Sequence, residues 1–176
     1  MASSATSYSA TANGAWGANG TWNGSGQNRQ PGNNAGDNAT ISNFSVFYNI
    51  ANTTVANLTV NGTGVLNFNQ AGTNILNVTG TTNLGGTGTI NISANGATLN
   101  TANLNVAGGT FAMNAGMLNV SSTANFNGGT TTLSGGTFRR RSPDCQRRHV
   151  EPERRQRHHG RGQRQRGQSE FLGGQR

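Results

Sequence analysis

Residues 102–120 read ANLNVAGGTFAMNAGMLNV, and the fold class can be predicted from this segment. It contains three triplets in which two apolar residues flank a central residue. The triplets are Leu104/Val106, Phe111/Met113 and Leu118/Val120. Such alternation is the period-2 signature of a strand that buries one face. Each triplet starts 7 residues after the one before it, which leaves room only for a short strand and a tight turn.

The same triplet occurs four more times upstream of this stretch. These copies are Leu58/Val60, Leu66/Phe68, Leu76/Val78 and Ile90/Ile92. In five of the seven triplets the central residue is Asn, at Asn67, Asn77, Asn91, Asn105 and Asn119. Asn is a poor strand former by itself, so its repetition favours amide ladders between stacked strands. The alternative, that each Asn only solvates an outward face, stays open.

A longer period overlies the triplets. It is carried by Ala56-Asn57-Leu58, Thr82-Asn83-Leu84, Ala102-Asn103-Leu104 and Ala124-Asn125-Phe126, whose last residues follow at intervals of 26, 20 and 22. Three short strands per interval make one coil of a three-sided solenoid, whereas hairpin sandwiches have longer strands and seldom keep a coil-length repeat. We therefore predict an all-β fold, a right-handed single-stranded parallel β-helix (solenoid) of about four to five coils over residues 41–138.

Two segments precede the repeats. Residues 1–13 have no apolar period, and we expect a disordered N-terminus there. Residues 14–40 contain Trp16 and Trp22 and are expected to form an N-terminal cap. The two indoles can be interpreted as platforms for sugars, but we prefer a cap over the first coil, because a cap protects a strand edge that would otherwise pair.

The charge of the chain lies almost entirely in its last segment. The 176 residues carry 13 basic and 5 acidic side chains, for a net charge of +8. Before position 139 there is only Arg29, balanced by Asp37, whereas residues 139–176 hold the other 12 Arg and no Asn or Thr. This Arg-rich tail has no apolar period, so we expect it to be disordered and, if genuine, to bind nucleic acid through charge alone.

A shifted reading frame explains the tail better than a nucleic-acid function does. Gln-Arg is commonly encoded by CAR-CGN, which gives Asn or Ser when it is read one nucleotide later. The dipeptide occurs five times, first at 146–147 and last at 175–176. The same shift allows residues 150–157 to encode Leu-Asn-Leu-Asn-Gly-Gly-Asn and residues 168–172 to encode Asn-Leu-Asn-Phe. We therefore interpret residues 139–176 as a frameshifted, non-native segment in the place of further coils.

The region before the repeats also contains motifs of a known kind. These are Trp22-Asn23-Gly24, Pro31-Gly32 and Gly36-Asp37-Asn38-Ala39-Thr40-Ile41. Paired Trp, a Pro-Gly turn and a Gly-Asp-x-Ala-x-Ile entry into the first strand resemble the opening of autotransporter passenger domains and related bacterial surface β-helix proteins. Repeats such as Val55-Ala56-Asn57-Leu58-Thr59-Val60 and Gly116-Met117-Leu118-Asn119-Val120 look like the strand repeats of the same family.

The resemblance implies an exported protein with a structural or adhesive role. Its location would be extracellular or at the bacterial cell surface, with a secretory signal that this sequence does not contain. The expected partners are cell-surface glycans or a host surface, together with self-association through the open end of the solenoid. We expect no specific nucleic acid and, since no apolar run is long enough, no membrane span in this sequence.

The repeat region lacks the residues that catalysis needs. β-Helix hydrolases and lyases require clustered carboxylates, or a carboxylate with Arg or Lys, because one group donates a proton while another accepts it. Residues 1–138 contain one Asp and no Glu, His, Cys or Lys. We therefore predict no enzyme activity and no catalytic, cofactor-binding or metal-binding residues. Two alternatives stay open: a non-catalytic part of a secreted polysaccharide-degrading β-helix enzyme, and a nucleic-acid binder if the basic tail is genuine.

Overall fold

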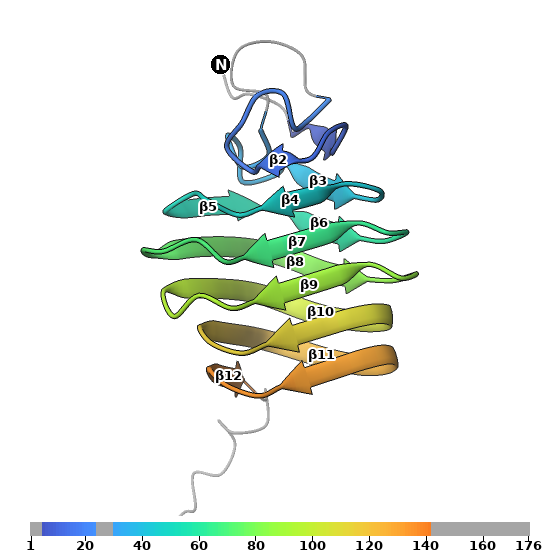
Figure 1. Ribbon diagram of the computed structural model, residues 1–176, viewed down its shortest axis with the longest axis vertical. Helices are drawn as coiled ribbons and strands as arrows, with labels where there is room; N and C mark the ends of the chain where they lie inside the picture. The colour runs from blue at the N-terminus through green and yellow to red at the C-terminus, as the bar shows by residue number, and fades with distance from the viewer. Residues whose placement is uncertain (1–4, 24–29, 142–176) are drawn as a thin grey trace, which may run out of the picture.

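The computed structural model describes residues 5–23 and 30–141, and all regular secondary structure in these ranges is β-strand. The strands are β1 (Ser7–Ser9), β2 (Gly14–Ala15), β3 (Asn38–Ile41), β4 (Ser45–Phe47), β5 (Asn52–Val55), β6 (Asn57–Val60), β7 (Val65–Phe68), β8 (Asn74–Leu84), β9 (Thr89–Ile92), β10 (Ala97–Met113), β11 (Met117–Leu133) and β12 (Thr137–Arg140). Every pairing between these strands is parallel. They stack as a β-solenoid of about five turns, which confirms the predicted fold class (Figure 1).

Each coil has three faces. Strands β1, β3 and β6 and the later part of β8 form the first face, which β10 and β11 continue. The second face consists of β2, β4, β7 and β9, followed by the last parts of β10 and β11. The third face runs from β5 through the first parts of β8, β10 and β11 to β12. In Figure 1 the near strands β4, β7 and β9 run leftward while the chain descends, so the solenoid is right-handed.

The core is a set of apolar columns inside the solenoid. Strands such as β7 and β9 alternate half-buried and buried residues, as the triplet pattern predicts. On the second face Leu66 stacks on Ile90 and Phe68 on Ile92, with all four side chains fully buried. Burial of such columns between coils provides most of the stability, because one coil alone buries little apolar area.

Stacked glycines make the corner between the first and second faces. Gly86, Gly109 and Gly129 occupy this turn in three successive coils, with φ values of 60°, 74° and 70°. Positive φ disfavours residues that carry a Cβ atom, and here the backbone of the neighbouring coil also lies against each position. The Gly-Gly pairs of the sequence are therefore a requirement of the tight turn.

The predicted alignment of the longer period is wrong by two residues at two of its four motifs, because Leu84 and Phe126 both lie in the column of Val60 and Val106. Leu84 lies in register with Val60 and Val106, whereas Leu58 and Leu104 both face Thr82. The coil lengths along this column are therefore 24, 22 and 20 residues up to Phe126, in place of 26, 20 and 22 between the aligned motifs. Thr82 occupies an apolar place because its hydroxyl donates a hydrogen bond of 3.0 Å to the Thr101 hydroxyl, which satisfies the buried polar group.

The prediction of disorder over residues 1–13 is wrong for residues 5–13. Strand β1 pairs with β3, and Tyr8 and Ala10 are buried. The backbone N–H of Ala10 bonds to the carbonyl oxygen of Thr40 at 2.9 Å, so this segment covers the edge of the first coil. A short polar strand of this kind needs no apolar period, because it is held mainly by backbone pairing with the edge strand and only slightly by apolar burial.

The solenoid also extends past the expected boundary at residue 138. Arg139 and Arg140 belong to β12 and pair with Asn119 and Val120, and the N–H of Arg141 bonds to the Val120 carbonyl oxygen. Backbone pairing accepts any side chain that can point to solvent, which explains why Arg continues the strand. The rest of the expected disordered tail, residues 142–176, lies outside the described residues, as do residues 1–4.

Candidate ligand-binding groove

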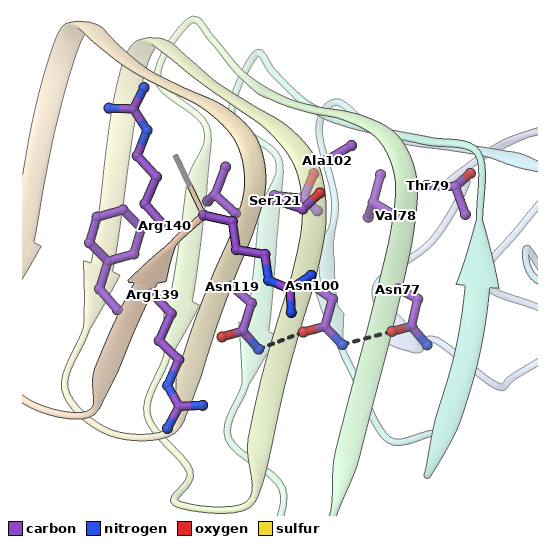
Figure 2. A pocket seen from close by; sticks show the side chains of 13 residues that line it. Asn77, Val78, Thr79, Asn100, Ala102, Asn119, Ser121, Arg139 and Arg140 are labelled. Carbon is purple, nitrogen blue, oxygen red and sulfur yellow. Dashed lines mark hydrogen bonds between the residues drawn. The ribbon is translucent and has the colours of Figure 1, made fainter. Parts of the chain in front are cut away.

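A groove of about 840 Å³ runs along the corner where the third face turns into the first. Four successive coils line it. The wall on the third face consists of Asn77, Asn100, Asn119 and Arg139, and the corner consists of Thr79, Ala102, Ser121 and Arg141. Figure 2 shows the three Asn side chains in one row, with Arg139 and Arg140 beyond the last of them.

The row of Asn side chains is an amide ladder with one direction. Asn77 donates from Nδ2 to Oδ1 of Asn52 at 2.8 Å, Asn100 donates to Asn77 at 2.7 Å, and Asn119 donates to Asn100 at 2.7 Å. Each amide thus donates toward the N-terminal end, and Asn77 and Asn100 also accept from the next coil (Figure 2). Aligned hydrogen bonds polarise one another, which strengthens the ladder beyond the sum of its separate bonds.

The local sequence places these amides directly above one another. Asn77, Asn100 and Asn119 are the outward middle residues of the third-face strands in β8, β10 and β11, and they pair in register. Parallel neighbours lie about 4.8 Å apart, a spacing that suits a bond from one carboxamide to the next. The repeated Leu-Asn-Val and Leu-Asn-Thr triplets therefore form the ladder without any long-range adjustment.

Shorter ladders occur on the other faces. Asn91 donates to Asn67 at 3.5 Å on the second face, and Asn105 donates to Asn83 at 3.4 Å on the first. Near the cap Asn57 donates to Asn38 at 2.9 Å. All five triplet Asn residues thus make a side-chain hydrogen bond with an Asn of a neighbouring coil. These bonds confirm the ladder interpretation over simple solvation. The third-face ladder is the longest and has the shortest bonds.

Three cations stand at the C-terminal end of the groove. Arg139 takes the place of the next Asn in the ladder, and Arg140 takes the inward place that Val120 has one coil earlier. Both are exposed, as is Arg141. The only carboxylate in the described ranges is Asp37, which is fully buried at the opposite end of the solenoid. No described carboxylate therefore neutralises the three guanidinium groups.

Asp37 has a structural role in the cap. Its carboxylate accepts hydrogen bonds from the backbone N–H groups of Thr6 at 2.9 Å and of Gly32 and Asn34 at 3.1 Å. Three donors hold the carboxylate in a buried place where an unpaired charge would be costly. Asp37 thus fastens the N-terminal segment and the Pro31-Gly32 turn to the first coil.

Trp16, Trp22 and Tyr48 also belong to the cap and core. The indoles of Trp16 and Trp22 are buried and lie edge to face at 4.9 Å, so neither is available to a sugar. Each indole N–H has a partner, the Pro31 and Trp16 carbonyl oxygens respectively. Burial raises the pKa of the Tyr48 hydroxyl, which donates to the Ile75 carbonyl oxygen at 2.6 Å.

No protein-family model, curated protein or solved structure matches the chain. The β-solenoid repeat therefore establishes the fold alone, and the groove is the feature that bears on function. In the described part of the chain no three His, Cys, Asp or Glu side chains gather as a metal site would need. Nor do these residues include a helix with the length and apolarity of a membrane span.

The sequence identified Asn77 and Asn119 of the groove but missed Asn100, whose neighbours Leu99 and Thr101 do not form an apolar pair. It marked Asn77, Asn105 and Asn119 as equivalent, yet which of them share a face depends on the coil lengths, which vary. A usable signal was present: Leu118-Asn119-Val120 and Phe138-Arg139-Arg140 lie 20 residues apart, one coil length, which places Arg139 beside Asn119.

Proposed function

We propose that this chain is a structural or adhesive part of an exported bacterial surface protein and performs no catalysis. The observation that carries the proposal is the amide ladder along an open groove, repeated over three coils in the same register. A repetitive polar wall suits an extended ligand with repeating groups, such as a glycan or the polymer coat of a host surface. A catalytic pocket would instead concentrate different groups at one point.

Self-association through the C-terminal end is a second part of the proposal. Phe126, Leu133 and Phe138 are 41%, 44% and 37% exposed, and they lie one on each face of the last coil. The strands of this coil have no neighbour on their C-terminal side within the described residues. An unpaired edge with exposed apolar side chains favours pairing with another chain.

Surface labelling of cells that naturally make the protein tests the location. An antibody against the solenoid, applied to intact cells, is expected to stain them, and brief protease treatment of intact cells is expected to remove the signal. Staining only after lysis would contradict an exported protein. Beads coated with the chain are expected to bind a subset of immobilised glycans, and a reducing-sugar assay on those same glycans is expected to show no cleavage.

A further inference from the structure

The second face of the solenoid carries a column of threonine side chains. Thr89 of β9 pairs with Thr110 of β10, which in turn pairs with Thr130 of β11, so the three residues lie in register on successive coils. They are 21 and 20 residues apart in the sequence, and a search for one fixed period therefore misses them. Strands β4, β7 and β9 of the same face run nearly parallel to one another in Figure 1, so this sheet has little twist.

A second outward column lies two residues further along each strand. It consists of Asn91, Ala112 and Thr132, which also pair in register. Neighbouring coils lie about 4.8 Å apart, and residues two apart on one strand are separated by about 6.6 Å. The six outward side chains of these three coils thus form a regular array, which we call the threonine grid. None of the six is charged or aromatic.

The hydroxyl groups of the threonine grid are available to water. Thr89 and Thr110 are half-buried and Thr130 and Thr132 are exposed, as outward residues of a solvated sheet are. Within residues 5–23 and 30–141 none of the four hydroxyl groups has a hydrogen-bond partner. The branched Cβ of threonine restricts χ1, so each hydroxyl and each methyl group occupies a nearly fixed position. Every hydroxyl can donate one hydrogen bond and accept two.

Fixed hydroxyl groups on a regular array hold water molecules at the same spacing as the array. The oxygen atoms of hexagonal ice repeat at similar distances along the planes of the crystal, so water bound to the threonine grid can become part of an ice lattice. The uncharged methyl groups between the hydroxyls do not disturb this lattice as a strongly hydrated ion would. We propose that the threonine grid binds the surface of ice. This ligand goes beyond the proposed function, and its face differs from the faces that form the groove.

A polysaccharide fits the threonine grid less well than ice does. Sites for organic ligands are usually lined with aromatic and apolar side chains that cover the ligand, and the grid has no aromatic residue. Phe47, an exposed aromatic residue of the same face, lies two coils away from Asn91. An acidic polymer would in addition need a cation, which the grid also lacks. Ice needs neither feature.

Uptake of the full chain into slowly growing ice tests the proposal. The unchanged chain is expected to be enriched in the ice over the remaining liquid and to slow the recrystallisation of small ice grains. Thr110→Tyr places a ring in the middle of the threonine grid and is expected to abolish both effects. The matched control is Thr59→Tyr on the first face, which also replaces a half-buried outward threonine between two stacked strands. This control is expected to behave like the unchanged chain.

Three outcomes would overturn the proposal. The first is exclusion of the unchanged chain from the growing ice. The second is full ice uptake of Thr110→Tyr, and the third is an equal loss of uptake in Thr59→Tyr, since either would assign the effect to another part of the chain. If Thr110→Tyr melts earlier than its control, Thr130→Tyr replaces it, because Thr130 is exposed in the last described coil. Surface staining of cells does not depend on ice, so failure of this inference and failure of the proposed function are distinguishable.

Discussion

The two ends of the solenoid follow the same register but differ in how they finish. At the N-terminal end the ring of Trp16 lies 4.9 Å from that of Trp22 and 5.3 Å from that of Tyr48, and all three side chains are buried. At the C-terminal end Phe126 and Phe138 also make an edge-to-face pair, at 6.5 Å, but both are more than a third exposed. One end is thus closed by a dedicated cap, and the other has the surface of an interior coil.

The last coil follows the solenoid pattern only up to Phe138. Beyond it, Arg139 interrupts the amide ladder, and within residues 5–23 and 30–141 the final Oδ1, on Asn119, has no donor from a further coil. Arg140 stands in the inward column of Val78, Thr101 and Val120. We propose that this break marks the entry into a shifted reading frame, since an uninterrupted repeat would carry an amide and an apolar residue at these two places.

Removing the cap has the largest expected effect. Trp16→Ala deletes a fully buried indole and its hydrogen bond to Pro31, so we expect a loss of about 3–5 kcal/mol in the free energy of unfolding. Phe138→Ala at the open end is the matched variant and should cost about 1 kcal/mol or less. Urea denaturation of both chains measures the difference. Equal losses would show that the two ends are covered to the same extent.

The buried carboxylate of the cap comes next. Asp37→Ala leaves the N–H groups of Thr6, Gly32 and Asn34 without this acceptor, and we expect a loss of about 2–4 kcal/mol. Asp37→Asn is the control, because it keeps one acceptor oxygen and should lose less. Hydrogen exchange at the three amides should accelerate in Asp37→Ala. Unchanged exchange would contradict the fastening role of Asp37.

Restoring the pattern at the open end should stabilise the protein. Arg139→Asn/Arg140→Val lets residue 139 donate to Asn119 and places an apolar side chain next to Val120, so we expect a gain of about 1 kcal/mol. The reciprocal change Val120→Arg puts a charge inside the solenoid and should destabilise it. Thermal melting compares the two. A lower melting temperature for the restored variant would show that position 139 is not a ladder position.

The smallest effect on stability is expected at the exposed apolar side chains. Phe126→Ser/Leu133→Ser should lower the free energy of unfolding by about 1 kcal/mol or less, because 41% of Phe126 and 44% of Leu133 are already exposed to solvent. The same variant should reduce self-association, which analytical ultracentrifugation measures. Undiminished association would place the contact elsewhere on the molecule.

How far the sequence predicts this molecule depends on the kind of feature. The period-2 triplets predict strands and inward residues because burial of one strand face is a local property of the chain. The alignment of coils was wrong at Thr82, since register also depends on the lengths of the turns and on a hydroxyl pair with Thr101. Pairing of β1 was missed because this edge strand is held by backbone hydrogen bonds that leave no mark on the side-chain pattern. The end of β12 was missed because Arg139 and Arg140 interrupt the apolar pattern, although their spacing from Asn119 and Val120 is one coil length.

The groove shows the same limit. Asn77 and Asn119 were identified individually, whereas Asn100 was missed because Thr101 breaks its apolar triplet. A groove also requires that these three residues share one face while Asn83 and Asn105 share another. That division follows from the positions of the corners, such as the one near Thr79 in β8. Corners depend on contacts between coils, and sequence spacing alone does not determine them.

The nucleotide sequence around codon 138 tests most directly the claim that the last coil is an interior coil. We predict an insertion or deletion there, with Asn- and Gly-rich repeats of the Leu-Asn-Val type continuing in the neighbouring frame at intervals of about one coil. The first restored coil should carry Asn and an apolar residue at the places of Arg139 and Arg140. Stop codons or unpatterned sequence in that frame would contradict it, and the basic segment would then be a genuine part of the protein.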